Sequence, residues 1–557
     1  RESGDYLLRK MLPGDIVLIA SPLLLTTILP MLCFLCHQQF GITDQDITVY
    51  QSMGVPPPTH CPDCRHLRHL VFRNERKLFL NKSHLSGKTI VSTYPSSSPF
   101  KIIDKDEWWS DSFDASIYGR DFDFNKPFFQ QFKELQREVP RWARMYINCE
   151  NSDYTNNSAG TKNSYLTFSS YDSENLYYCM RVIRCNMCID CLNVKDSQYC
   201  SQCVECKKCY GTHYSQLSDG CSDSYFLYDC RNCKNCIFCA QIRNKEYMIF
   251  NKQYSKEKFE KEKEKFLKKL FEDKKTLAKE FENLKKQLFH KNLRIINSEN
   301  CTGDFINDSK NITNGFYVTE AEDCVNVYDC SKIKNCYDNT ANDKSELCLE
   351  CDTSYELYNA KFCSYTVTSE NVSYCDQCVN ANNCFGCVGL HHAEFMILNK
   401  KYTKEDYEIL LAKIKKHMEK TCEWGKPFPS TLSSYPYNVT VANEYCPLTR
   451  EQALEQGYLW HDDDACAQGN NDQALTCEKS GKSYKIIPQE LKFYETFKLP
   501  TPRISPDERY KELLSLQPPK KLTDSICSHC AKNIKTVYTA DSGYKVLCRK
   551  CYLDTVY

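Results

Sequence analysis

The sequence predicts a mainly β protein with helical insertions. Its centre is expected to be a cysteine- and tyrosine-rich β-solenoid in two blocks, flanked at both ends by treble-clef or zinc-ribbon modules. Three observations predict this fold: a periodic block of cysteines, paired C-x2-C motifs near both ends, and two internal duplications. The sequence shows no catalytic constellation, so it predicts no reaction.

The periodic block contains thirteen cysteines between Cys179 and Cys239. Cys185, Cys200 and Cys230 share one phase of a fifteen-residue period, and the other cysteines of the block fall into three more phases. A short fixed period is typical of stacked coils, in which a residue type that recurs once per coil forms a column. The sequence therefore predicts coils of about fifteen residues with cysteine ladders between them. Additional metal sites and disulfides are the alternatives.

Composition limits the classes of function. The 557 residues include 72 lysines and arginines and 72 aspartates and glutamates, so no overall charge attracts nucleic acid or an anionic membrane. The 37 cysteines are an odd number, and eight of them stand in terminal C-x2-C pairs, which favours a reducing, cytoplasmic location over a disulfide framework. The run from Ile16 to Cys36 has no charged residue, although Pro22 and Pro30 interrupt it. Membrane anchoring through residues 16–36 is the alternative to a plain apolar extension.

The first metal motif is C-x2-C-x24-C-x2-C, formed by Cys33, Cys36, Cys61 and Cys64. Two such pairs of thiolates can hold one tetrahedral zinc ion in a closed structural site. A helix is expected after Pro62, and it would carry the second pair.

That helix and the residues after it are basic. These basic residues have two interpretations. They could contact nucleic-acid phosphates, or they could simply form a solvated helix face. The residues concerned are Arg65, Arg68, Arg73, Arg76 and Lys77.

The N-terminal module recurs 444 residues later without a gap. Cys33 aligns with Cys477, but Ser480, Ser505 and Glu508 replace the other three ligands, so no zinc is expected there. The same offset aligns Ser83–Tyr94 with Cys527–Tyr538, where the C-terminal copy keeps its ligands. This second set has the spacing C-x2-C-x17-C-x2-C, and its members are Cys527, Cys530, Cys548 and Cys551. The sequence thus predicts about two zinc ions per chain.

A second duplication relates the two cysteine-rich blocks at an offset of 148 residues, where CIFC from Cys236 matches CFGC from Cys384. These relations divide the chain into nine segments. They are an apolar extension (1–32), a zinc module (33–95), an aromatic helical segment (96–148), the first solenoid block (149–254), a long amphipathic helix (255–292), the second solenoid block (293–402), a helix (403–420), a linker (421–473) and the second copy of the terminal module (474–557).

Three helices are expected outside the zinc modules. The first begins at Pro127 and places Phe128, Phe132 and Leu135 on one face. The second spans 255–290, where apolar residues at alternating threes and fours form a seam for another helix. That partner is either the helix at 403–420 or a second copy of the chain, which would make an oligomer.

The phrases HCPDCRHLRHLVFRNERKLF, DFDFNKPFFQQFKELQREVPR, MIFNKQYSKEKF and EYCPLTREQALEQGYLW resemble a group of cysteine-rich zinc-ribbon and repeat proteins from bacteria of the candidate phyla radiation. Some members of that group carry a CaiB/BaiF-type CoA-transferase label. The resemblance covers about Cys33 to Tyr557 and implies zinc-ribbon ends around a repetitive middle. Where the group usually has further cysteines, this sequence has Ser83 and Ser86.

The function that these observations favour is a zinc-binding scaffold for a protein partner, since broad stacked surfaces suit binding. One alternative is nucleic-acid binding through the terminal zinc modules and the basic helix after Cys64. Another is an enzyme, a transferase or hydrolase, whose site is assembled from residues distant in the sequence.

Overall fold

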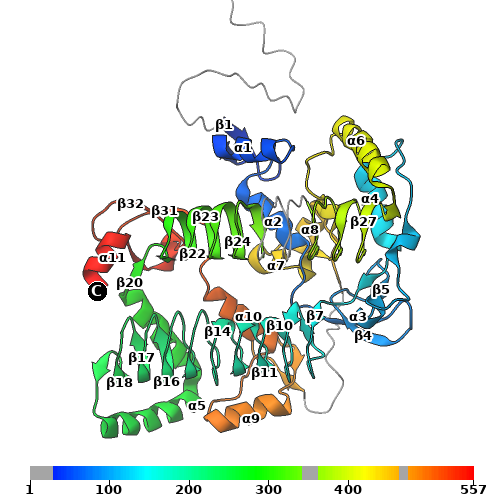
Figure 1. Ribbon diagram of the computed structural model, residues 1–557. Helices are drawn as coiled ribbons and strands as arrows, with labels where there is room; N and C mark the ends of the chain where they lie inside the picture. The colour runs from blue at the N-terminus through cyan, green and yellow to red at the C-terminus, as the bar shows by residue number, and fades with distance from the viewer. Residues whose placement is uncertain (1–28, 342–361, 463–473, 557) are drawn as a thin grey trace, which may run out of the picture. The chain divides into compact units, whose positions relative to one another are not determined.

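Most of the strands belong to two parallel stacks, seen in Figure 1 as rows of short, nearly parallel strands. The computed structural model describes residues 29–341, 362–462 and 474–556. The chain divides into two compact units, residues 1–61 and residues 62–557, and both stacks lie in the second unit. The strands of the first stack are β7 (Tyr146–Ile147), β8 (Thr155–Asn156), β9 (Ser158–Ala159), β10 (Thr167–Tyr171), β11 (Glu174–Tyr177), β12 (Met180–Ile183), β13 (Asn186–Ile189), β14 (Leu192–Lys195), β15 (Tyr210–His213), β16 (Ser222–Tyr228), β17 (Lys234–Ala240), β18 (Glu246–Ile249) and β19 (Lys252–Gln253).

Neighbouring strands of the first stack pair in parallel with partners twelve residues apart, except β18 and β19, which pair antiparallel. Phe168 pairs with Met180 and Met180 with Leu192. Isolated bridges such as Leu192 to Val204 continue the same register where no strand is long enough to be named. The expected period of fifteen residues is therefore wrong, since each residue lies beside the one twelve positions later.

The backbone explains both the true period and the mistaken one. Every third residue of the first stack has a positive φ, and Asn175, Tyr178 and Arg181 are consecutive examples. Each left-handed residue turns the chain, so twelve residues make four three-residue sides, with the residue after each turn pointing inward. Twelve and fifteen are both multiples of three. A fifteen-residue spacing therefore keeps a cysteine inside but moves it to the next side.

Most inner positions of the first stack hold small side chains with a polar atom, and a few hold larger apolar ones such as Leu176 and Leu227. The thiol of Cys203 lies 3.5 Å from the carbonyl oxygen of Ser201 and 3.2 Å from that of Thr212. Thr212, at the equivalent place, has its hydroxyl 3.2 Å from the carbonyl oxygens of Tyr210 and Cys221. Cysteine thus occupies the positions that serine and threonine occupy in other coils, as a small hydrogen-bonding residue.

The second stack repeats this geometry. Its strands are β21 (Ile295–Ile296), β22 (Glu299–Asn307), β23 (Lys310–Thr319), β24 (Glu322–Ser331), β25 (Tyr337–Thr340), β26 (Asn382–Phe385), β27 (Glu394–Ile397) and β28 (Lys400–Lys401). Its register is again twelve, except at its two ends. At the start Ile295 pairs with Ile306 and a bulge lies between Cys301 and Gly303, and at the end β27 and β28 pair antiparallel. Residues 342–361, part of the predicted second block, lie outside the described residues.

Eleven helices lie within the described ranges. They are α1 (Asp44–Ser52), α2 (Pro62–Val71), α3 (Lys105–Trp108), α4 (Phe128–Glu138), α5 (Lys256–Gln287), α6 (Lys404–Lys420), α7 (Ala442–Tyr445), α8 (Arg450–Glu455), α9 (Pro488–Phe497), α10 (Pro506–Ser515) and α11 (Arg549–Val556). The remaining strands form short pairs: β1 (Leu29–Leu32) with β2 (Gln39–Ile42), β3 (Phe79–Lys82) with β4 (Thr89–Ser92), β5 (Ile102–Ile103) with β6 (Arg141–Trp142), β20 (Phe289–Lys291) with β33 (Lys545–Leu547), β29 (Leu475–Thr476) with β30 (Ser483–Tyr484), and β31 (Thr523–Ile526) with β32 (Asn533–Thr536).

The apolar seam of α5 packs on the first stack, below strands β16 to β18 in Figure 1. Aromatic rings at the left-handed corner of successive coils form a ladder with centroids 4.8 to 4.9 Å apart, made by Tyr214, Phe226, Phe238 and Phe250. Phe266 and Phe281 of α5 contact Phe226 and Phe238 in this ladder. The structure thus packs this seam on the stack, whereas the sequence offered the helix at 403–420 as its partner within the chain. Pairing with a second copy of the chain stays a prediction.

The structure describes only part of the apolar run at residues 16–36, for which the sequence left membrane anchoring open. Residues 16–28 of the run 16–36 lie outside the described residues, and Leu29–Leu32 form strand β1. Across the described ranges, no helix is both long enough and apolar enough to cross a membrane.

The inner positions give a first prediction. We expect Cys203→Ser to keep the stack nearly as stable as it is now, because the hydroxyl reaches the same two carbonyl oxygens. Cys203→Leu should lower the free energy of unfolding by about 1–3 kcal/mol, because Cys203 is already fully buried and the larger side chain would have to displace its inner neighbours. Urea unfolding followed by circular dichroism measures both, with the exposed Lys207→Leu as the control. Equal stability of Cys203→Leu and Cys203→Ser would contradict the packing described here.

Candidate metal centres

Four hairpins of the chain share one tight turn, and this turn supplies the first ligand position of each candidate site. The N–H group at its first residue donates to the carbonyl oxygen five residues later, at 2.8 to 2.9 Å, and the residue four positions on has a positive φ. The first residues are Cys33, Ser83, Cys477 and Cys527. Because the turn directs backbone N–H groups inward, a thiolate there receives hydrogen bonds before any metal arrives.

The C-terminal hairpin forms a complete set of four thiols. The sulfur atoms of Cys527, Cys530, Cys548 and Cys551 lie within 4.8 Å of one another. Cys527 and Cys530 come from the turn between β31 and β32, whereas Cys548 and Cys551 stand at the start of α11. The Cys530 and Cys548 sulfurs are 3.9 Å apart, close to the separation of about 3.8 Å that two ligands of a tetrahedral zinc ion adopt.

The electrostatics of this set favour a thiolate at Cys527, whereas the side-chain hydrogen bond with Cys548 raises the pKa of Cys551 to about 12. The N–H group of Cys548 donates to Cys527 Sγ at 3.3 Å. Burial opposes ionisation of the Cys527 thiol, but the backbone hydrogen bonds prevail and lower its pKa to about 6. A thiolate at neutral pH is the form that binds a metal ion.

The N-terminal hairpin gives the same arrangement. The sulfur atoms of Cys33, Cys36, Cys61 and Cys64 also lie within 4.8 Å of one another, and the Cys36 and Cys61 sulfurs are 3.7 Å apart. The Cys61 N–H donates to Cys33 Sγ at 3.3 Å. Burial again opposes ionisation, and backbone hydrogen bonds lower the pKa of Cys33 to about 6. The predicted grouping of four cysteines at each end of the chain is confirmed.

These donor sets determine what a bound metal could do. Four thiolates complete a tetrahedron, so no position remains for water or a substrate, as a catalytic zinc would need. A metal ion there would fix the turn to the following helix. Across the described ranges, these two are the sets of three or more metal-binding side chains close enough to share an ion.

In the hairpin at Ser83, a side-chain hydrogen bond occupies the place of the four metal ligands in the C-terminal hairpin. At the offset of 444 residues, Asp104 and Glu107 stand where Cys548 and Cys551 stand in the complete set. The Ser83 hydroxyl donates to Glu107 Oε2, which also accepts the N–H of Asp104 at 3.1 Å. Extending the alignment by a few residues would have identified both carboxylates from the sequence.

The hairpin at Cys477 keeps one thiol, and an ion pair occupies the position of its fourth ligand. Cys477 Sγ accepts the N–H groups of Ser505 and Ser480 at 3.2 and 3.5 Å, as Cys33 does in its own turn. Glu508, at the position of the fourth ligand, pairs with Lys511 at 2.6 Å and with Lys479 at 3.6 Å. Lysine ammonium groups therefore neutralise the acidic side chain that replaced a cysteine.

Two of the five basic residues expected to contact nucleic acid are buried. Arg65 is 3% exposed and pairs with Asp338 of the second stack, and Arg73 is equally buried and pairs with Glu75. Both guanidinium groups therefore have carboxylate partners inside the protein, and a phosphate could not reach them without disrupting these pairs.

The other three basic residues lie nearer the surface. The Arg76 guanidinium stacks over the Tyr510 ring at 3.5 Å and lies 3.5 Å from Asp507. Lys77 pairs with the same carboxylate at 3.3 Å, and Arg68 is half-buried. Arg76 and Lys77 thus connect the first module to α10 of the second.

A buried polar cluster attaches the second module to the first stack. Arg509 of α10 donates from Nε to Asp190 at 2.9 Å and from Nη2 to Glu490 at 3.0 Å. All three side chains are almost fully buried, so two carboxylates share one guanidinium. Among the described residues, Glu490 Oε2 has no hydrogen-bond partner. Burial raises the pKa of Glu490 to about 7, against the effect of Arg509.

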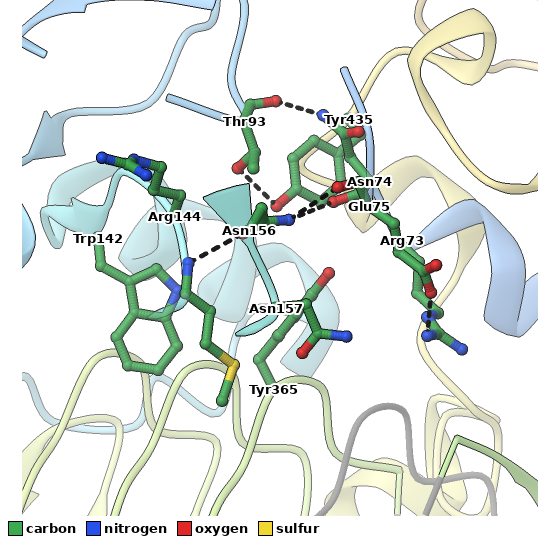
Figure 2. Close-up of a pocket in the computed structure, with 11 residues that line it drawn as sticks. Arg73, Asn74, Glu75, Thr93, Trp142, Arg144, Asn156, Asn157, Tyr365 and Tyr435 are labelled. Carbon is green, nitrogen blue, oxygen red and sulfur yellow. Dashed lines mark hydrogen bonds and ion pairs between the residues drawn. The ribbon is translucent and has the colours of Figure 1, made fainter. Parts of the chain in front are cut away.

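A small pocket lies where the first module meets the start of the first stack (Figure 2). Asn156 connects its walls by donating to the carbonyl oxygens of Asn74 and Glu75, at 3.2 Å each, and by accepting the Met145 N–H at 3.0 Å. The pocket has a volume of about 10 Å³, so it has room for one water molecule at most. This pocket is therefore a packing feature.

Comparison with protein-family models and with curated proteins finds no match to this chain.

The incomplete hairpin at Cys477 gives a second prediction. We expect the triple variant Ser480→Cys, Ser505→Cys, Glu508→Cys to bind one more zinc ion than the wild-type chain, because the turn and its N–H donors are already in place. Metal analysis of the purified protein measures the change. The matched control adds Cys477→Ala to the same triple variant and should lose the extra ion. An unchanged zinc content in the triple variant would contradict the equivalence of the four hairpins.

The cluster at Arg509 gives a third prediction, on pH. The pKa of Glu490 is higher in the folded protein than in an unfolded chain, so folding favours its protonated form. The stabilisation is complete below the ordinary carboxyl pKa of about 4.3 and is lost as the pH rises through about 7. It amounts to at most about 4 kcal/mol, so the melting temperature should fall over this range.

Glu490→Gln should remove this part of the pH dependence, because the amide stays neutral. The control is Glu495→Gln, an exposed residue of the same helix. Thermal unfolding followed by calorimetry from pH 5 to pH 8 compares the variants. A Glu490→Gln melting curve with the wild-type slope would show that Glu490 does not hold the proton.

Proposed function

We propose that this protein is a zinc-stabilised scaffold that binds a protein partner, and that its two parallel stacks are β-solenoids of twelve-residue coils. The observation that carries the proposal is the pair of all-cysteine sets, one in each terminal module. Zinc suits them because four thiolates at tetrahedral separations form a closed structural site. In this account the metal holds a treble-clef or zinc-ribbon turn to its helix, and the stacks supply the binding surface.

The outer sides of the first stack support the binding role. Each exposed side presents one outward side chain per coil, so it forms columns with a fixed spacing. Lys195, Lys207 and Tyr210 are exposed there, and Lys162 pairs with Glu150 of the neighbouring coil at 3.3 Å. Mixed charges with exposed aromatic rings suit a protein partner, whereas nucleic acid would need a basic surplus. The resemblance to candidate-phyla-radiation repeat proteins is consistent with this function.

A cobalt replacement experiment tests the metal half of the proposal, and it is our fourth prediction. We expect about two metal ions per chain and, with cobalt(II), the absorption of a tetrahedral four-thiolate site. That absorption should not change when azide is added, because no coordination position is open. Cys530→Ser should remove one ion, whereas Cys422→Ser, which changes an exposed cysteine outside both sets, should remove none. Binding of azide to the cobalt would instead indicate an open, catalytic type of site.

A photo-crosslinking experiment tests the binding half. A crosslinking amino acid at Tyr210, on the exposed side of the first stack, should capture one discrete protein in growing cells. The same amino acid at Leu553, exposed on α11 outside both stacks, is the control. Capture from Leu553 alone, or from neither position, would contradict binding by this surface of the stack.

A further inference from the structure

A cavity of about 270 Å³ lies between the first stack and the C-terminal module. Its floor consists of outward side chains from three successive coils, Val204, Gln216 and Tyr228, which are direct neighbours in the parallel register. Its roof comes from the segment between β32 and β33, with Tyr538 and Tyr544. Such a mixture of apolar rings and a few polar groups is typical of a small-molecule site.

The charged groups of this cavity already have ion-pair or hydrogen-bond partners inside the protein. Lys285 Nζ lies 2.8 Å from Glu282 Oε1, and Arg294 Nη1 lies 3.0 Å from Asp304. The carboxylate of Glu205 accepts hydrogen bonds from Asn193 at 2.8 Å and Gln517 at 2.6 Å. An anionic ligand would therefore meet no unpaired cation, and a cationic ligand would have to displace the amides of Asn193 and Gln517 from the Glu205 carboxylate, so desolvation of either would be poorly compensated.

Two neutral polar groups facing the cavity remain available for a ligand. Gln216 is only 6% exposed, and its Oε1 accepts from Lys285 at 2.8 Å. Its Nε2 group forms no hydrogen bond with any described residue, although a buried amide normally uses both ends. The Tyr544 hydroxyl likewise has no partner in the described part of the chain and can both donate and accept.

The aromatic walls of the cavity add a further requirement on the ligand. Tyr538 and Tyr544 meet edge to face, with centroids 5.3 Å apart, and the His290 ring lies 4.2 Å from that of Tyr544. Pro518 and Pro519 form another apolar part of the lining. The ligand must therefore combine apolar C–H surface with groups that both donate and accept hydrogen bonds.

We infer that this cavity binds an uncharged polyhydroxylated molecule the size of a monosaccharide. Its hydroxyl groups would accept from Gln216 Nε2 and exchange hydrogen bonds with the Tyr544 hydroxyl, while its C–H faces would contact the tyrosine rings. Neutrality follows from the internally paired charges, and the size follows from the volume. This inference does not rest on the scaffold function proposed above.

Ligand-observed NMR on the full-length, metal-loaded protein tests the inference. The probes are glucose, galactose, mannose, N-acetylglucosamine and ribose, with choline and inorganic phosphate as charged comparisons, all at millimolar concentration. We expect saturation transfer to at least one sugar and to neither charged probe.

Two variants locate the site, and a third is the matched control. Tyr544→Phe removes only a hydroxyl group, and Gln216→Leu removes the amide; each should weaken sugar binding about tenfold, the effect of one lost hydrogen bond. Gln198→Leu changes an exposed glutamine of the same stack that lies outside the cavity and should leave binding unchanged. Melting temperature and zinc content show whether each variant is folded.

Three results would overturn the inference. The first is that none of the five sugars binds. The second is that a sugar binds but the folded Tyr544→Phe variant binds it equally well. The third is that choline or phosphate binds and Tyr544→Phe weakens this binding. Because zinc content is measured separately, these results would leave the metal proposal intact.

Discussion

The inner position of each three-residue side is the constraint on which the stacks depend. Most of these inner side chains are small, because four sides enclose them, although Leu176 and Leu227 occupy the same inner phase. Where the side chain is polar, its polar atom lies near carbonyl oxygens two residues before and nine residues after it. For Cys203 these are the oxygens of Ser201 and Thr212. Serine, threonine and cysteine meet both conditions, and of the three cysteine has the most apolar side chain. The abundance of cysteine in the middle of the chain is thus a packing requirement.

Each module contacts the stack of the other half of the chain: the first module packs on the second stack, and the second module on the first stack. Arg65 of the first module pairs with Asp338 of the second stack, whereas Arg509 of the second module pairs with Asp190 of the first stack. The two arginines are 444 residues apart and the two aspartates 148, which are the offsets of the two duplications. Both aspartates occupy left-handed corners. A buried ion pair adds little net stability, but breaking one is costly, so these pairs specify which surface each module meets.

The sequence predicted the features that depend on spacing along the chain and missed those that depend on contact. The spacing of Cys527, Cys530, Cys548 and Cys551 was enough to group them, because a C-x2-C turn has one geometry. The coil length was not determined, since fifteen residues and twelve both keep Cys185 and Cys200 inside the stack. Nothing local to Arg65 indicates that it is buried, because its partner Asp338 lies in another segment. A basic residue on a predicted helix therefore suggested a phosphate contact.

The four related hairpins also show why some metal sites persist and others do not. A hairpin that loses a cysteine must replace the link between its turn and the following helix. Ser83 does so with a hydrogen bond to Glu107, and the hairpin at Cys477 does so with the pairing of Lys479, in the turn, and Glu508, on α10. The hairpin at Cys33 belongs to a unit that ends at residue 61, too small to build a large apolar core. There a metal ion, if bound by the four cysteines, would supply stability that packing cannot, so loss of its ligands would be harder to compensate.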